Sequence, residues 1–367
     1  MKKIFSIVLV MLLSIAIFAG CNNRSQAPSP TPPPPAPTEE TTVEPGDDVQ
    51  DDYEEVDDNG NGEQAAAPAD GDFRMAFVAR SQADPFAVWL SDSVLAEAEN
   101  FPNITVTVYD GMADDSVQNA HIETAIVQDY DIIVVQPNNG EVQRSFVEAV
   151  VDAGILTMTT NARIDGIPGA SSVDADPFEQ GAVQARAAID MIPDGANVVV
   201  LLGPPGNFHA DERERAWDEI FFSARPDVVE VGRDIANWET PQAQTLMEDW
   251  ILAQDGNIDA IISMNDGMAI GAITAWEMAG HEGNDILSFA VDGTAEAVLA
   301  IRDGRLTQTT LQSANALAEL ILQTANDLLT GVQSQIDVDI DNPVVTIDNV
   351  QQFIDMHINA GNLPAGS

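Results

Sequence analysis

Composition and charge narrow the class of this protein before any motif is considered. The chain has 367 residues, of which 60 are acidic and 14 basic, giving a formal net charge of −46 at pH 7. So negative a chain is repelled by nucleic acid and by anionic lipid, and we expect neither as a direct partner. Cys21 is the only cysteine, which excludes a disulfide framework inside the fold.

The first twenty residues have the pattern of a signal peptide. Lys2 and Lys3 precede an apolar run over 4–18, and about fifteen such residues are too few to span a bilayer comfortably but suit a signal peptide. The small residues before Cys21 resemble the lipobox of bacterial lipoproteins, in which the cysteine is lipidated. We therefore predict a signal peptide over 1–20, lipidation at Cys21 and an extracytoplasmic protein anchored to the bacterial membrane. A plain secretory signal is the alternative, because Phe18 stands where leucine is usual.

Residues 21–72 offer little to bury, and we expect them to form a disordered tether. Proline dominates from Pro28 to Pro37 and favours a stiff polyproline conformation, whereas the acidic residues from Glu39 to Glu63 repel one another. The stretch 57–62 copies the first half of an EF-hand calcium loop, but Pro68 stands where a bidentate glutamate is needed. We expect no metal site here, and the four histidines elsewhere lack metal-ligand spacing.

From residue 73 onward, short apolar runs alternate with amphipathic stretches of helical length. Strands are predicted over 75–79, 104–109, 131–136, 155–159, 197–202, 228–233, 260–264 and 286–291. Helices are predicted over 86–100, 116–128, 142–153, 179–191, 211–224, 241–254 and 267–279. This alternation predicts an α/β protein whose parallel sheets are covered by helices on both faces.

The repeated strand–helix units are too many for one ordinary open sheet. They leave an α/β barrel or two doubly wound, Rossmann-like lobes as the possible architectures. We interpret the segment 171–174 as a plain crossing segment rather than a unit of its own, which favours two lobes.

Polar and aromatic residues gather just after the predicted strands. In open α/β sheets, ligands bind beyond the carboxyl ends of the strands. Amides, carboxylates and guanidinium groups supply paired hydrogen-bond donors and acceptors, and aromatic rings supply flat apolar faces. That combination suits a sugar, which has both hydroxyl groups and apolar C–H faces. The candidate ligand-binding residues are Asp84, Phe86, Gln136, Asn161, Arg163, Arg213, Trp238, Asn265, Asp292 and Gln312.

Several of these candidates have a purely structural alternative. Asp292 can form a turn, and Arg213 can pair with acidic neighbours on a helix surface. For Arg163, the sequence favours neither a ligand contact nor a structural role. Asn265 and Asp266 can both act as N-caps of the helix that follows them.

Five short motifs follow one another along the chain. They are Asp84-Pro85-Phe86, Gly203-Pro204-Pro205-Gly206 with Asp211-Glu212-Arg213, Ala236-Asn237-Trp238, Asn265-Asp266-Gly267-Met268 and Val291-Asp292-Gly293-Thr294. Together they resemble the ribose/galactose-type substrate-binding proteins of ABC sugar importers, the type I periplasmic binding proteins. The resemblance covers nearly all of residues 73–350. It implies two Rossmann-like lobes that are joined by three crossover strands and close over one solute. On this basis the N-terminal lobe is expected to contain residues 73–174 and about 312–338, and the C-terminal lobe residues 175–311 and about 339–362. The resemblance also implies that Asp266 caps the helix that follows it and that Asn265 contacts the ligand.

The chain departs from the ribose-binding pattern at several positions. Asp84 replaces an asparagine, Ala87 stands where a second aromatic residue is common, and Val291 replaces an aromatic residue. Asn161-Ala162-Arg163 replaces an Asp-Arg pair, so the arginine reaches the site from one residue later or not at all. These changes keep a polar site and leave the identity of the sugar open.

The resemblance implies a solute-binding protein that captures a small ligand, first of all a monosaccharide, and delivers it to the permease of an ABC transporter. The alternative is a sensor that presents a sugar or signalling molecule to a chemoreceptor or histidine kinase. An enzyme is disfavoured, because the chain has no P-loop, dinucleotide fingerprint or Gly-x-Ser-x-Gly elbow, and no lysine after Lys3. We therefore expect a monomer without enzymatic activity and without a cofactor.

Overall fold

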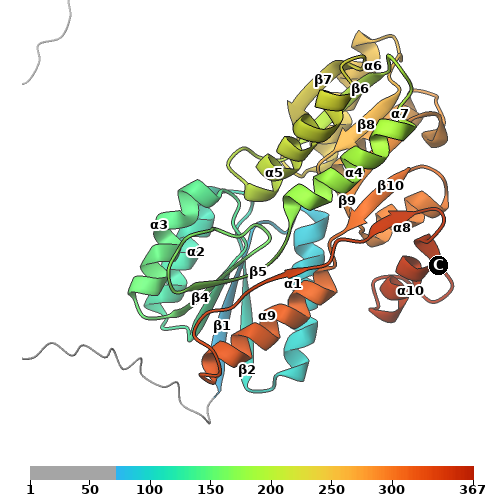
Figure 1. The fold of residues 1–367 in the computed structure, drawn as a ribbon. Helices are drawn as coiled ribbons and strands as arrows, with labels where there is room; N and C mark the ends of the chain where they lie inside the picture. The colour runs from blue at the N-terminus through green and yellow to red at the C-terminus, as the bar shows by residue number, and fades with distance from the viewer. Residues whose placement is uncertain (1–71) are drawn as a thin grey trace, which may run out of the picture. The chain divides into compact units, whose positions relative to one another are not determined.

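The computed structural model describes residues 72–367. The predicted signal peptide, Cys21 and the predicted tether up to residue 71 lie outside the described residues. Within 72–367, none of the helices is both long and apolar enough to cross a membrane. Two β-sheets with helices on their faces organise this part of the chain (Figure 1).

The first sheet is parallel and has the strand order β11-β5-β4-β3-β1-β2. Its strands are β1 (Phe73–Ala79), β2 (Ile104–Asp110), β3 (Ile132–Val135), β4 (Leu156–Thr160), β5 (Ala170–Ala175) and β11 (Asp337–Ile340). Every residue of the central strand β3 is buried, which explains its continuous apolar sequence. Val78 pairs with Val135, so β1 and β3 end near each other at the carboxyl edge of the sheet.

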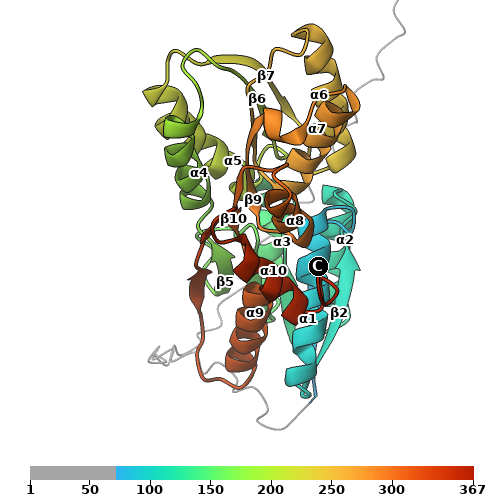
Figure 2. The same ribbon diagram turned by 90° about the vertical axis from the view of Figure 1, so that its right-hand side faces the viewer.

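Helices cover both faces of the first sheet. α2 (Asp115–Val127) and α3 (Gly140–Asp152) lie on one face, and α1 (Pro85–Glu97) and α9 (Ala314–Leu329) lie on the other (Figure 2). Side-chain alternation along β1 separates the two faces, since Val78 packs in the same cluster as Ile122 of α2 and Phe77 in the same cluster as Leu90 of α1. A 3₁₀ turn, Ala98–Asn100, follows α1.

The second sheet has the strand order β12-β10-β9-β8-β6-β7, with β12 antiparallel to β10 and the other pairs parallel. Its strands are β6 (Asn197–Leu202), β7 (Val229–Ile235), β8 (Ala260–Ser263), β9 (Leu287–Asp292), β10 (Gln308–Leu311) and β12 (Val344–Thr346). The helices around it are α4 (Pro177–Met191), α5 (Phe208–Ala216) with a π-helical extension Trp217–Phe222, α6 (Thr240–Ala253), α7 (Asp266–Met278), α8 (Ala295–Arg302) and α10 (Val350–Asn359), besides a 3₁₀ turn Gly283–Asp285.

The chain crosses between the two sheets three times, from β5 to β6, from β10 to β11 and from β11 to β12. The predicted α/β fold with two doubly wound, parallel-sheet lobes is thereby confirmed. The interpretation of 171–174 as a plain crossing segment is wrong, because these residues form β5 and pair with both β4 and β11. Ser171, Ser172 and Asp174 make this strand polar, which hid it from a search for apolar runs.

Loops at the rims of the two sheets hold the lobes together. The side chain of Asn207 donates hydrogen bonds to the carbonyl oxygens of Pro137 and Asn138, at 3.2 and 3.1 Å. The main-chain nitrogen of Gly140 donates to the carbonyl oxygen of Gly206 at 3.0 Å. Gly206 has a φ of 77°, which favours glycine. The structure therefore describes lobes that are in direct contact.

Candidate functional site

A small, deeply buried cavity lies between the carboxyl ends of the two sheets. Each residue that lines it is at most 5% exposed. The free volume of the cavity is only about 10 Å³. The lining residues are Arg80, Asp84, Phe86, Asn161, His209, Arg213, Trp238, Asn265, Asp292 and Gln312. All the candidate residues predicted from the sequence except Gln136 and Arg163 are therefore brought together here.

Helix N-termini place two of the polar residues. Asp84 caps α1, and its carboxylate accepts a hydrogen bond from the main-chain nitrogen of Phe86 at 2.9 Å. Asn265 caps α7, and its side-chain oxygen accepts from the main-chain nitrogen three residues later at 2.9 Å. Short polar residues are favoured at such positions because they satisfy free N–H groups of the first turn. Each cap thereby also fixes a side chain at the edge of the cavity.

The sequence analysis expected Asp266 to cap α7, and this expectation is wrong, because Asn265 takes the capping position. Asp266 is fully buried in the first turn of the helix. Its carboxylate accepts hydrogen bonds from the main-chain nitrogen of Thr294 at 2.8 Å and from the hydroxyl of Thr309 at 2.6 Å. It thus ties the loop after β9 to β10 and supports the cavity from behind.

Asp292 ends β9 and is the most weakly paired carboxylate of the cavity. Its Oδ1 lies 3.4 Å from Nε2 of Gln312 and 4.0 Å from the guanidinium of Arg213. Burial raises the pKa of the Asp292 carboxyl well above its ordinary value; Arg213 opposes this shift and Asp266 adds to it. The backbone of Asp292 has a φ of 130°, an unusual value for a residue other than glycine. Such a carboxylate has free acceptor capacity for the hydroxyl groups of a ligand.

Arg213 is held by its own lobe rather than by its acidic neighbours in the sequence. It donates to Oε1 of Gln180 at 2.7 and 3.0 Å and to the carbonyl oxygen of Met264 at 2.7 Å. Burial lowers the pKa of Arg213 to about 10, and Asp292 opposes this shift. The predicted alternative, pairing on the helix surface, applies instead to Arg215, which binds Glu212. Arg213 therefore presents a fixed, buried cation to the cavity.

Trp238 forms an aromatic wall of the cavity. Its ring lies so close to Gly203 that a Cβ atom there would stand 2.3 Å from the ring. The guanidinium carbons of Arg80 and Arg213 lie 5.7 and 5.8 Å from its ring centre, a cation–π arrangement. Phe86 supplies a second, buried ring from the other lobe. The site thus combines ring faces with charged donors and acceptors.

Gln136 lies beneath the cavity rather than on its wall. Its side-chain oxygen accepts from the main-chain nitrogen of Arg80 at 3.0 Å, and its amide nitrogen donates to Oδ1 of Asn161 at 2.8 Å. Gln136 is completely buried. It therefore positions two lining residues and is not itself placed to touch a ligand.

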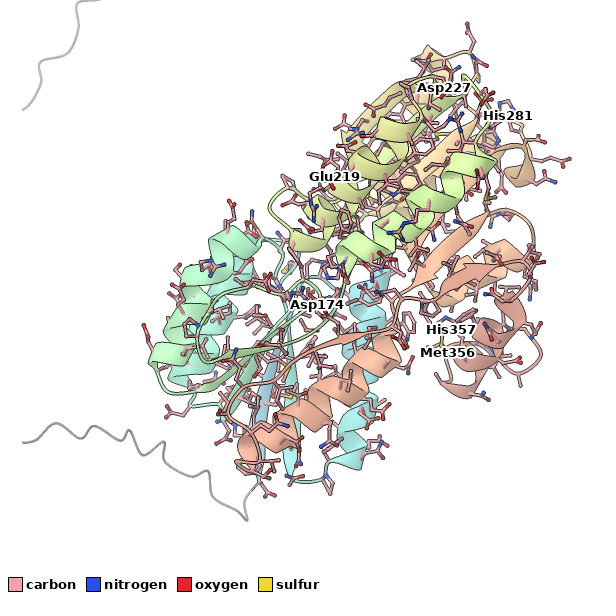
Figure 3. The ribbon with its side chains drawn as sticks, in the orientation of Figure 1. Asp174, Glu219, Asp227, His281, Met356 and His357 are labelled. Carbon is pink, nitrogen blue, oxygen red and sulfur yellow. The ribbon has the colours of Figure 1, made fainter. Side chains whose placement is uncertain are left out.

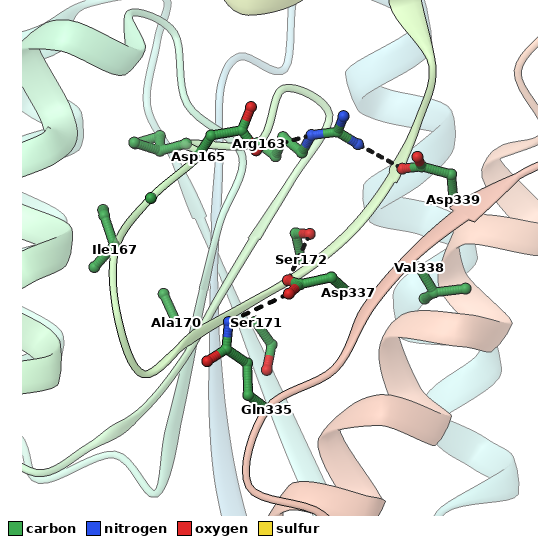
Figure 4. A pocket seen from close by; sticks show the side chains of 12 residues that line it. Arg163, Asp165, Ile167, Ala170, Ser171, Ser172, Gln335, Asp337, Val338 and Asp339 are labelled. Carbon is green, nitrogen blue, oxygen red and sulfur yellow. Dashed lines mark hydrogen bonds and ion pairs between the residues drawn. The ribbon is translucent and has the colours of Figure 1, made fainter.

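Arg163 points away from the cavity. Its guanidinium binds Asp339 at 2.6 Å and Asp165 at 3.1 Å, beside β5 and β11 (Figure 4). Its main-chain nitrogen donates to Oδ2 of Asp174 at 2.7 Å, which fixes this direction. Arg163 lines a different cavity, of about 320 Å³, on that side of the first sheet. The structure therefore does not place Arg163 with the other candidate residues.

Sequence analysis missed two lining residues, Arg80 and His209. Arg80 directly follows β1, so the rule that selected the other candidates also applies to it. His209, from α5, bonds through Nε2 to Oδ1 of Asp174 at 2.9 Å, and Asp174 lies in β5 (Figure 3). Burial lowers the pKa of His209, although Asp174 opposes this shift. No local sequence pattern distinguishes this histidine, because its partners come from distant segments.

The chemistry of the site is that of hydrogen bonding and stacking. Within 72–367, no three His, Cys, Asp or Glu side chains are grouped as metal ligands would be. The donors are Arg80, Arg213 and Trp238, and the clearest free acceptor is Asp292. Such a set can bind an uncharged molecule that carries several hydroxyl groups.

The chain is similar to several known binding proteins of small solutes. The xylitol-binding protein of Mycolicibacterium smegmatis is 28% identical over 242 residues, which are 66% of this chain and 68% of that protein. The ribose import binding protein of Bacillus subtilis is 27% identical over 252 residues, 69% of this chain and 80% of that protein. A solute-binding protein of an ABC transporter from Bacillus halodurans, solved with bound myo-inositol, superposes with a TM-score of 0.72 at 26% identity, covering 78% of this chain and 98% of that one.

A family model gives the assignment that these individual likenesses support. The model described as periplasmic binding protein domain matches residues 75–333, which include β2 to β10, most of β1 and every residue that lines the cavity. Its members are substrate-binding proteins that work outside the cytoplasm. The chain therefore belongs to the periplasmic binding protein domain family.

Proposed function

We propose that this protein captures a neutral, polyhydroxylated small molecule, a monosaccharide or a polyol, and delivers it to the permease of an ABC importer. The observation that carries the proposal is the cavity between the lobes, where two rings, two arginines and a weakly paired aspartate converge. Relatives whose names specify xylitol and ribose support the ligand class. The protein binds its ligand without changing it chemically.

Closure of the two lobes is the proposed mechanism of capture. The free space in the cavity is too small for a sugar ring, so a ligand enters only when the lobes separate or the lining side chains move. Because both lobes supply lining residues, a ligand that contacts both stabilises the closed arrangement. We also propose that residues 73–174 with about 312–338, and residues 175–311 with about 339–362, are the units that move, except that residues 339 and 340 move with the first unit because β11 pairs with β5.

A ligand screen with two readouts tests the proposed function. The chain from residue 22 onward is heated with D-ribose, D-xylose, xylitol and myo-inositol, and a ligand that binds the folded state raises its melting temperature. Small-angle scattering then compares the radius of gyration with and without the best ligand, and we expect a smaller value with ligand. If none of these compounds stabilises the protein, the proposed ligand class is wrong.

The lipid anchor is a separate proposal, supported by the signal-peptide pattern that ends at Cys21. We expect Cys21→Ser to release the protein from the membrane fraction without changing its affinity for ligand, because the residues that line the cavity, from Arg80 onward, are distant from Cys21 in the sequence. Fractionation of cells that express the wild type and the variant measures the release. Equal membrane association of both proteins would exclude lipidation at Cys21 as the anchor.

We further propose that the protein acts as a monomer.

A further inference from the structure

We infer that Arg80, together with Trp238, determines ligand specificity by donating hydrogen bonds to an oxygen atom of the ligand. This inference rests on the proposed function and names two further contacts of the same site. The sequence analysis considered Arg163 as the arginine that contacts the ligand, and we now assign this contact to Arg80, which lies 83 positions earlier in the chain. Both side chains line the cavity, one from each lobe.

Three groups hold Arg80 in place, two of them through its side chain. Its main-chain nitrogen donates to Gln136 at 3.0 Å, and its Nη1 donates to the carbonyl oxygen of Asn161 at 3.1 Å. Its Nη2 binds the carboxylate of Asp84. Arg80 is 5% exposed and Asp84 is 3% exposed, so this ion pair is shielded from solvent. The guanidinium is therefore fixed before a ligand arrives.

The remaining donor of Arg80 has no partner. Among residues 72–367, neither Nε of Arg80 nor Nε1 of Trp238 makes a hydrogen bond, although both atoms are buried. A buried N–H group without an acceptor costs free energy, so its presence in a cavity indicates a missing partner. The guanidinium carbon lies 5.7 Å from the indole centre, so the two side chains that carry these donors are neighbours in the cavity. A hydroxyl oxygen of the ligand supplies the acceptor.

Charge balance favours a neutral ligand at this position. Asp84 already neutralises Arg80, and Arg213 faces Asp292 across 4.0 Å. The two cations and the two carboxylates therefore cancel when both acids are ionised. A sugar acid would add a negative charge beside Asp84 and Asp292 and gain no unpaired cation. Arg80 thus acts as a hydrogen-bond donor rather than as a counter-charge.

The test replaces Arg80 by lysine and makes the same change at Arg163 as a matched control. Lysine keeps a cation to pair with Asp84 but has no N–H group at the position of Nε. We expect Arg80→Lys to weaken binding of the best compound among D-ribose, D-xylose, xylitol and myo-inositol by about tenfold or more, since a charged donor is lost. Arg163→Lys should bind that compound like the wild type, because its partners lie outside the cavity.

Deoxy analogues separate a specific contact from a general disturbance. Titration calorimetry compares the same compound with each of its monodeoxy analogues. If Arg80 reads one oxygen, the analogue that lacks this oxygen should bind the wild type and Arg80→Lys with equal affinity. A purely structural role of Arg80 would instead lower the affinity for every analogue by the same factor, and would overturn the inference.

The other outcomes are also decisive. If Arg80→Lys binds with wild-type affinity, the role of Arg80 is overturned but the proposed function is not. The same conclusion follows if only Arg163→Lys loses binding. Failure of the wild type to bind any of the four compounds overturns the proposed ligand class and this inference with it. If Arg80→Lys does not fold, Trp238→Phe tests the second donor, because it keeps a ring but removes the N–H group. Unchanged selectivity in that variant would overturn the donor pair.

Discussion

Asp292→Ala is expected to weaken ligand binding by more than tenfold while the protein still folds. The weakly paired carboxylate is the free acceptor of the cavity, so its loss leaves ligand hydroxyls and Arg213 without their partner. Truncation of one member of a buried, hydrogen-bonded charged pair costs roughly 2–5 kcal/mol, and about 1.4 kcal/mol corresponds to a factor of ten. Calorimetry with the best compound of the screen measures the change.

The matched control for this experiment is Asp303→Ala. Asp303 belongs to the same lobe but is half exposed and pairs only with the neighbouring Arg302. Its removal should leave the affinity unchanged. An affinity of Asp292→Ala close to that of the wild type, with the fold intact, would show that the ligand does not bind in this cavity.

Acidification gives an independent view of the same group. Because burial raises the pKa of Asp292, the carboxylate takes up a proton at a higher pH than an exposed aspartate does. The protonated form is a poorer acceptor, so affinity should fall as the pH is lowered through this raised pKa. The effect should be absent in Asp292→Asn, which cannot ionise.

The position of the site was predictable because it follows from topology. Parallel strands bring their carboxyl ends to one edge, and the residues after each strand are local in the sequence. Asp84, Trp238, Asn265 and Asp292 all follow this rule and line the cavity. The rule also applies to Arg80, which directly follows β1 and lines the cavity although it was not among the predicted residues.

The direction of a side chain was less predictable than its position. Arg163 follows β4 as the rule requires, yet Asp339 of β11 binds its guanidinium and holds it away from the cavity. The partner lies 176 residues away, so no local pattern reveals it. The same holds for His209 and Asp174, whose bond links the two lobes. The position of each candidate residue could therefore be predicted from the strands, but the direction of its side chain depended on charged partners that are distant in the sequence.

Stability should depend on pH through Asp266. Burial raises the pKa of Asp266 to about 7 in the folded protein, from 3.8 for an ordinary aspartate. Between these two values the folded state binds more protons than the unfolded state, so the contribution of this group is largest below pH 4 and is lost as the pH rises through 7. At about 1.4 kcal/mol for each pKa unit, the loss is on the order of 4 kcal/mol.

Asp266→Asn isolates this contribution. The asparagine oxygen can still accept from the main-chain nitrogen of Thr294, and its amide nitrogen can donate to the hydroxyl of Thr309. Because the amide does not titrate, the variant should gain stability relative to the wild type between pH 4 and pH 8. Urea unfolding at both pH values measures the difference in the free energy of unfolding, with Asp303→Asn as the exposed control. The same difference at pH 4 and pH 8 would show that Asp266 ionises in the fold as readily as an exposed aspartate.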